Sequence, residues 1–241
     1  MCGRYALYGP WAGLSTVAGG AFDAALGPLS DWQRYNQAPG QHLPVITRDA
    51  DGPSLRHAHW GLIPPWLKTT TTSFSTFNAR AESVVTKPTF RDAWRSGRRC
   101  LVPASGWFEW RQGAGREACY LSAPTLDRVP LMFAGLWSET HVEGATLGSY
   151  TIITTEARGV VREVHDRQPR LLPPELWMAW LDASPAQAER WLGAEETSLR
   201  WHRVGKAVGN VRIDEPSLIA PYIPNANEPL ISDLFSPPNG D

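Results

Sequence analysis

A cysteine stands at position 2, directly behind the initiator methionine, in the opening stretch MCGRYAL. If Met1 is removed, Cys2 carries a free α-amine and a thiol on adjacent carbons. The amine ordinarily titrates at about 7.7–8.0 and the thiol at about 8.5, so part of the amine is unprotonated at neutral pH. Such an amine adds to an aldehyde, and the thiol can then close on the imine carbon as a five-membered thiazolidine. The alternative for an early cysteine is a small buried hydrophobic residue.

A glutamate lies among large aromatic residues in the segment GWFEW. Trp107, Phe108 and Trp110 can partly desolvate the carboxyl group of Glu109, which would raise its pKa toward neutrality. A carboxylic acid that stays protonated can donate to the hydroxyl that departs as a Schiff base forms. The alternative is a strand with one solvent-facing acid.

The segment VHDRQP places His165 beside Asp166 and Arg167. A lone histidine is usually structural, whereas one with an acid and an arginine as neighbours is a candidate for proton transfer. The six histidines of the chain show no HxxxH or HExxH spacing. We therefore expect no metal site and no cofactor.

Two arginine-containing stretches could bind phosphate. In FNARAES, Asn78 and Arg80 are two residues apart, so an extended backbone points both to one face. An amide beside a guanidinium suits a sugar oxygen and a phosphate, while the alternative is an asparagine turn with an exposed arginine. The stretch RDAWRSGRR is either a solvated helix face or one wall of a phosphate-binding groove.

Composition limits the class of protein. The chain has 241 residues, of which 42% are hydrophobic and 20% charged, as expected for one globular domain. Its net charge of −1 argues against coating nucleic acid by charge alone but permits a local basic groove. No apolar run approaches the roughly 18 residues of a membrane span, and the start lacks a signal-peptide core. Three cysteines, an odd number, are typical of a reduced cytoplasmic protein.

The elements that must position these residues are predicted to be mostly strands. The 12 tryptophans, 21 prolines and 21 glycines favour a turn-rich, largely β protein. Alternation predicts strands at 43–48, 56–63, 100–110, 129–137 and 149–157. Helices are predicted at 11–26, from a Thr89 cap to Gly97, at 173–181 and at 184–192. Residues 34–40 are predicted to form a turn, and 204–213 a strand or loop.

Seven segments together resemble the SRAP (SOS response-associated peptidase) family, whose members are also called abasic-site processing proteins. They are MCGRYAL, RYNQAPG, WGLIPPW, NARAES, GWFEW, VHDRQP and AVGNVR. The resemblance spans about residues 2–222. It implies a single α+β domain over 2–222, with a barrel-like, mostly antiparallel β core and peripheral helices. A poorly ordered tail is expected over 223–241.

The resemblance also implies an activity. Family members recognise abasic sites in single-stranded DNA and link to them covalently through the N-terminal cysteine. It implies that Cys2 is the nucleophile, that Asn78 positions the amine or the opened sugar, and that Glu109 is the general acid–base. His165 would assist sugar ring opening. The positions expected to hold phosphates or to line the DNA groove are Arg4, Asn36, Trp66, Arg80, Trp110 and Arg167.

Several expectations accompany this function. The protein should be a cytoplasmic monomer that joins the nucleoid when bound to DNA, without a membrane, and replication-fork proteins are candidate partners. Slow strand cleavage by β-elimination and self-processing by the peptidase are side activities, although only Met1 precedes Cys2. Gln37 and Gln168 depart from the family pattern, which puts fine substrate contacts in doubt. The alternatives are a non-covalent reader of damaged or modified DNA and a thiol peptidase that uses Cys2 with His165.

Overall fold

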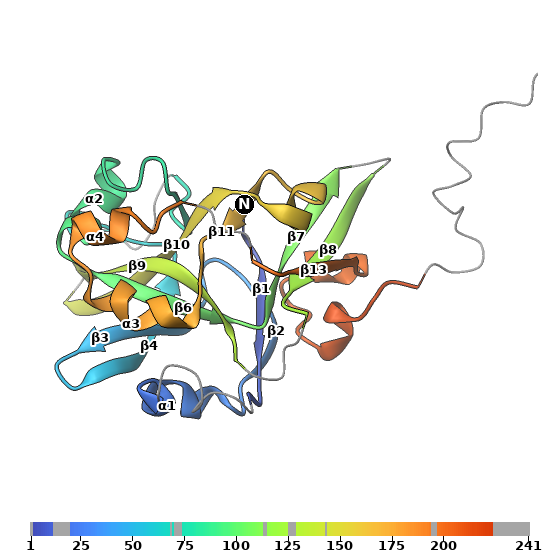
Figure 1. Cartoon of the computed structure of the whole chain (residues 1–241), viewed down its shortest axis with the longest axis horizontal. Coiled ribbons are helices and arrows are strands. Elements are labelled where there is room, and N and C mark those ends of the chain that lie inside the picture. The colour runs from blue at the N-terminus through green and yellow to red at the C-terminus, as the bar shows by residue number, and fades with distance from the viewer. Residues whose placement is uncertain are drawn as a thin grey trace, which may run out of the picture.

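Five strands close on themselves into a barrel in the computed structural model (Figure 1). The structure describes residues 2–11, 20–67, 69, 74–112, 115–124, 129–142, 144–193 and 197–223. The barrel order is β10-β4-β3-β6-β9, closed by pairing of β9 with β10, and only the β10–β4 contact is parallel. Its strands are β3 (His42–Asp49), β4 (Gly52–Trp60), β6 (Arg99–Ala104), β9 (Leu131–Val142) and β10 (Ala145–Glu156). The expected mostly antiparallel, barrel-like core of an α+β domain is confirmed.

A second, five-stranded antiparallel sheet carries the start of the chain. Its order is β13-β8-β7-β1-β2. The strands are β1 (Tyr5–Tyr8), β2 (Gln33–Gln37), β7 (Gly106–Gln112), β8 (Arg116–Ser122) and β13 (Arg200–Arg203). Because β1 pairs with β7 through Tyr5 and Trp107, the residues before Tyr5 run beside Glu109.

The predicted strand at 100–110 is in fact two strands in two sheets. Ser105 separates them, accepting a hydrogen bond from Tyr8 N at 2.9 Å and donating one to Tyr8 O at 3.0 Å. A Cβ on the next residue, Gly106, would lie 2.5 Å from the backbone oxygen of Leu121. This close approach lets the chain leave the barrel and enter the second sheet at that point.

Three short strands extend the barrel toward the functional residues. β5 (Asn78–Arg80) runs parallel to β10, β11 (Arg167–Pro169) runs antiparallel to β10, and β12 (Leu171–Leu172) pairs with β9. The entry to β5 is held by Trp60, whose Nε1 donates to Phe77 O at 2.9 Å. Since β5 and β11 both pair with the last residues of β10, that strand fixes the positions of Asn78 and of the segment after His165.

The helices are short and peripheral. They are α1 (Asp23–Leu26), α2 (Pro88–Arg95), α3 (Pro174–Asp182) and α4 (Pro185–Glu189), with 3₁₀ turns η2 (Gly27–Leu29), η3 (Gly159–Glu163), η4 (Lys206–Gly209) and η5 (Pro216–Ile219). The predicted Thr89 cap is wrong: α2 begins at Pro88, which suits a first helical position, and Thr89 is buried within the helix. Gly97 (φ +65°) follows the end of α2, as predicted. No helix in the described ranges is long and apolar enough to cross a membrane.

Other predictions differ from the structure in detail. The predicted turn at 34–40 begins as strand β2, because its residues pair with β1. Residues 204–213, predicted as a strand or loop, form η4 and loop. In the predicted helix 11–26, residues 12–19 lie outside the described ranges and only Asp23–Leu26 is α-helical. Apart from Ile223, the expected tail at 223–241 also lies outside them.

Aromatic packing joins the barrel to the second sheet. The ring of Tyr5 in β1 lies 5.0 Å from that of Trp60 in β4, and Trp107 in β7 lies 5.9 Å from Phe133 in β9. All four side chains are buried. These edge-to-face contacts fix β1 against the barrel, and with it the position of Cys2.

Candidate active site

A groove of about 1320 Å³ opens between the β7–β8 hairpin and the segment that joins η3 to β11. The start of the chain lies at this groove, and Figure 1 shows β7 and β11 on either side of the N-terminal end of β1. The arginines that line it are Arg4, Arg80, Arg111, Arg116, Arg162 and Arg167. The acids are Glu109, Glu156, Glu163 and Asp166. Arginines therefore outnumber acids, although the whole chain is nearly neutral.

Cys2 is fully buried and is not among the residues that line the groove, but the next two residues, Gly3 and Arg4, are. Phe108 N donates to Arg4 O at 2.9 Å and so holds the first residues against β7. The Asn78 side chain donates from Nδ2 to the carbonyl oxygen of Cys2 at 2.7 Å. Burial, and after it the negative charge of Glu109, raise the pKa of the Cys2 thiol well above its ordinary value. The thiol is therefore protonated at neutral pH.

Glu109 projects from β7 and is only 2% exposed. Burial is the main cause that raises the pKa of its carboxyl group to about 7. Both protonation states are then populated near neutral pH, which is what a general acid–base requires. The desolvated acid predicted from the aromatic neighbours in GWFEW is present, since Trp107 and Phe108 are also fully buried.

His165 lies opposite Glu109, with its Nε2 3.9 Å from Glu109 Oε2. The backbone N–H of Arg167 donates to His165 Nδ1 at 2.9 Å. Asp166 Oδ1 lies 2.8 Å from the same Nδ1 and accepts a hydrogen bond from it when Nδ1 carries a proton. Burial lowers the pKa of His165, which favours the neutral form.

Asn78 reaches the site because β5 runs in register with β10, where Asn78 is opposite Ile152. Its Oδ1 atom is buried and has no hydrogen-bond partner among the described residues. One amide group thus holds the Cys2 backbone through Nδ2 and offers Oδ1 to an incoming group. Arg80, two residues further on, is exposed and lines the groove, whereas Asn78 is not among the lining residues.

The outer groove contains arginines that the sequence motifs did not single out. Arg116 and Arg162 are exposed, and Arg111 pairs with Glu117 at 2.6 Å. The Arg116 guanidinium lies 5.0 Å from the ring centre of Trp110, a cation–π contact on the groove wall. A charged residue just after a hairpin turn is too common in sequences to mark such a site.

Arg167 lies in the groove lining but is already paired. Its two terminal nitrogens donate to Glu82 at 2.7 and 3.0 Å, and Nη2 also donates to Thr154 O at 2.7 Å. The side chain of Arg167 is 13% exposed. A phosphate would therefore have to compete with Glu82, which the sequence analysis did not identify.

Two expected contact positions lie elsewhere than the groove surface. Asn36 is 0% exposed, so it stands behind Arg4 and cannot meet a ligand directly. Trp66 is 53% exposed but is not part of the groove lining. Gln37 and Gln168, which depart from the family pattern, are both buried and therefore form no surface contacts. Gln37 accepts a hydrogen bond from Trp32 Nε1, and Gln168 accepts one from Arg158 N.

The arginine-rich stretch around α2 is not a wall of this groove. Arg91 and Arg95 are exposed on the helix and absent from the groove lining. Arg99 is buried between Trp94 and Trp180, with its guanidinium 5.4 and 5.8 Å from their ring centres. The solvated helix face is thus the better interpretation for Arg91 and Arg95. The described residues contain no group of three or more potential metal ligands.

Known proteins resemble this chain in sequence and fold. Residues 1–211 match the family model described as SOS response associated peptidase (SRAP). "Abasic site processing protein YoaM" of Bacillus subtilis is 34% identical over 186 residues, which cover 76% of this chain and 79% of that protein. "Abasic site processing protein YedK" of Escherichia coli is 30% identical over 195 residues, 78% of this chain and 84% of that protein. A crystal structure of a Bacteroides thetaiotaomicron protein, 23% identical, shares the fold with a TM-score of 0.74 over 92% of this chain and all of its own.

Proposed function

The chain belongs to the SOS response associated peptidase (SRAP) family, and we propose that it captures abasic sites in single-stranded DNA as a covalent thiazolidine on Cys2. An abasic deoxyribose is in equilibrium with an open-chain aldehyde, and removal of Met1 would give Cys2 the amine that condenses with it. The abasic site then stays covalently bound to the protein, which shields it.

The observation that carries this proposal is the placement of Cys2 among three polar side chains at an arginine-lined groove. Asn78 Nδ2 holds the Cys2 carbonyl at 2.7 Å, and the Glu109 carboxyl group lies 3.9 Å from His165 Nε2. The charge of Glu109 acts on the Cys2 thiol. Removal of Met1 would therefore bring an amine, a thiol, an acid and a base together beside the groove, which supports capture of a sugar aldehyde there.

The proposed reaction has two covalent stages. The Cys2 amine nitrogen attacks the C1′ aldehyde carbon, and the carbinolamine loses its hydroxyl as water with a proton from Glu109. The Cys2 sulfur then attacks the iminium carbon, and its proton passes to the Glu109 carboxylate. The product is a neutral thiazolidine, whose mass equals protein plus DNA minus one water. His165 would assist opening of the sugar ring by moving a proton at the ring oxygen or hydroxyl.

The protonation states support an order in which the amine acts first. A buried thiol with a raised pKa is a poor nucleophile until a neighbouring base accepts its proton. Glu109 becomes that base once it has protonated the departing hydroxyl. The same burial disfavours a general thiol peptidase, in which the thiolate must attack unaided by a prior imine.

The groove supports single-stranded DNA as the ligand. The exposed side chain of Arg80 lies two residues from Asn78, and Arg116 and Trp110 continue the groove away from Cys2. A missing base removes the usual handle for sequence readout, so phosphate contacts and aromatic stacking supply the binding energy. Slow strand cleavage by β-elimination from the iminium is a side activity of the same site.

The test is intact mass spectrometry of the purified protein before and after mixing with single-stranded DNA that carries one abasic site. We expect loss of Met1, followed by a gain equal to the DNA minus one water. Salt-sensitive but fully reversible binding without a mass gain would instead favour a non-covalent reader. Processed protein that neither binds nor captures the DNA would refute the proposal.

A further inference from the structure

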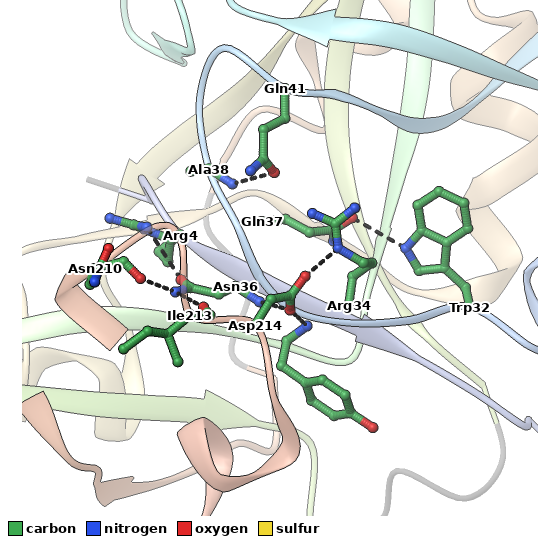
Figure 2. A network of polar contacts seen from close by, with 11 residues as sticks. Arg4, Trp32, Arg34, Asn36, Gln37, Ala38, Gln41, Asn210, Ile213 and Asp214 are labelled. Carbon is green, nitrogen blue, oxygen red and sulfur yellow. Dashed lines mark hydrogen bonds and ion pairs between the residues drawn. The ribbon is translucent and has the colours of Figure 1, made fainter. Parts of the chain in front are cut away.

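The carboxylate of Asp214 holds the segment at residues 208–214 against strand β2 (Figure 2). The Asp214 carboxylate accepts from the backbone N–H groups of Tyr35 at 2.5 Å and Asn36 at 3.0 Å through Oδ1. Its Oδ2 atom pairs with Arg34 Nε. Charge-assisted bonds from three donors hold this carboxylate in one orientation. Asp214 thereby fixes the backbone on which the Asn36 side chain stands.

The Asn36 side chain in β2 also donates hydrogen bonds to the segment at residues 208–214. Its Nδ2 group donates to the carbonyl oxygens of Ile213 at 2.7 Å and Asn210 at 3.0 Å. Its Oδ1 atom accepts from Arg4 Nη1 at 3.3 Å. Because Asn36 has no exposed surface, its amide cannot turn without leaving buried polar groups unsatisfied. Figure 2 shows Asn36 between the segment and Arg4.

Arg4 is the end of this chain of contacts and belongs to the groove. It lies two residues after Cys2 and lines the groove together with Gly209, which belongs to the segment at residues 208–214. Its Nε atom is buried and has no hydrogen-bond partner among the described residues. The contact with Asn36 Oδ1 therefore helps to set the direction in which the guanidinium points.

We infer that Asp214 is a positioning residue that acts through Asn36 to aim the Arg4 guanidinium at the phosphate beside the abasic site. This inference rests on the proposed function, because it assigns a phosphate of that substrate to Arg4. Asp214 lies beyond residues 1–211, the part that the family model matches. An arginine held in its binding orientation loses less side-chain entropy when it binds a phosphate, so releasing it weakens binding.

A double-mutant cycle tests the inference. The variants are Asp214→Asn, Arg4→Gln and both together, measured against single-stranded DNA with a tetrahydrofuran abasic analogue, which has no aldehyde. We expect about tenfold weaker binding for Arg4→Gln, the effect of losing about 1.4 kcal/mol, and about threefold for Asp214→Asn. The double variant should bind no more weakly than Arg4→Gln, because Asp214 acts only through Arg4.

The salt dependence supplies a readout that a structural role would not change. Loss of one phosphate contact to a single strand lowers the slope of log K against log salt by about 0.7. Arg4→Gln should show this reduction, Asp214→Asn part of it, and the double variant no more than Arg4→Gln. Condensation of Cys2 with a small uncharged aldehyde should be unchanged in Asp214→Asn, since that reaction needs no phosphate clamp.

A matched control is Asp182→Asn. Asp182 also pairs with an arginine, Arg48, at 2.8 Å, but it lies at the end of α3 and outside the groove lining. This variant should bind the analogue as tightly as the unmodified protein and with the same salt slope. If Asp214→Asn does not fold, Asp214→Glu, which keeps the charge and displaces the carboxylate, takes its place in the cycle.

The outcomes separate this inference from the proposed function. If the unmodified protein captures abasic DNA but the effects of Asp214→Asn and Arg4→Gln multiply, Asp214 only stabilises the fold and the inference is overturned. An unchanged affinity and slope in the Asp214 variant would overturn it as well. If the unmodified protein neither binds nor captures abasic DNA, the proposed function fails and the inference fails with it.

Discussion

The inner and outer parts of the groove differ in how far their side chains are exposed to water. At the inner end, Cys2 and Glu109 are buried, and burial is the main cause of their raised pKa values. At the outer rim, Arg80, Arg116 and Arg162 are exposed to water. Chemistry near neutral pH needs groups whose charged forms are disfavoured by burial, whereas phosphate binding needs charges that are already present and accessible. Under the proposed function, the buried residues would serve the chemistry and the exposed arginines the binding of phosphate.

The two regions differ in side-chain burial more than in backbone, since Asn78 and the rim residue Arg80 share strand β5. Glu109 stands in β7 with its side chain buried. The rim residue Arg116 opens strand β8 beside the hairpin turn. Substitutions at the inner end should alter the rate of covalent capture and leave affinity intact, while substitutions at the rim should do the reverse.

The largest effect is expected at Cys2. Cys2→Ala keeps the α-amine but lacks the thiol, so it can form only a reversible imine and no thiazolidine. We expect complete loss of denaturant-resistant adduct in gel and mass measurements, with affinity for the tetrahydrofuran analogue within about twofold, since Cys2 makes no phosphate contact. Stable adduct in this variant, without added reductant, would contradict the assignment of the thiol.

Glu109→Gln should give the second largest effect. Loss of a general acid–base slows a reaction by about 10²–10⁴-fold, and we expect capture to slow by at least about 100-fold at pH 7 without weaker DNA binding. With a Glu109 pKa of about 7, the acid form needed to release water declines above that pH. The unmodified protein should lose rate on this alkaline side, and the variant should not. Identical rate–pH profiles would remove Glu109 from the mechanism.

The same substitution should stabilise the fold at high pH. The folded pKa of Glu109, about 7, exceeds the ordinary value of 4.5, so the folded state binds the proton more tightly than the unfolded chain. Stability is therefore lost as pH rises from about 4.5 to about 7, by up to about 3 kcal/mol. In denaturant titrations, Glu109→Gln should be more stable than the unmodified protein at pH 8 and equal to it at pH 4. Equal stability at both values would show that the carboxyl group carries no burial penalty.

The smallest effect is expected at the rim. Arg80→Gln should weaken binding to single-stranded DNA by about three- to tenfold and lower the salt slope by about 0.7, with the maximal rate of capture unchanged. Arg91→Gln is the matched control, because Arg91 is an exposed arginine of α2 outside the groove. A change of maximal rate in Arg80→Gln, or an equal loss in the control, would contradict the separation of binding from chemistry.

Much of the candidate site could be predicted from local pattern. The aromatic neighbours of Glu109 predict a desolvated acid, because a run of large apolar residues indicates a strand that is buried on both faces. The two-residue spacing of Asn78 and Arg80 predicts one shared face, since that rule depends only on extended backbone. By contrast, nothing local indicates that Ser105 divides one apolar run into strands of two different sheets.

The sequence by itself determined which chemical groups are available: a cysteine directly behind Met1, an acid among aromatic residues, a histidine, and several arginines. Only the tertiary structure decided which of these groups are buried, paired or free to bind. Arg167 pairs with Glu82, which is 85 positions away in the chain, and the backbone of Asn36 bonds to Asp214, which is 178 positions away. The physical reason is that desolvation and hydrogen bonding depend on neighbours in space, which the barrel and the second sheet bring together from distant segments.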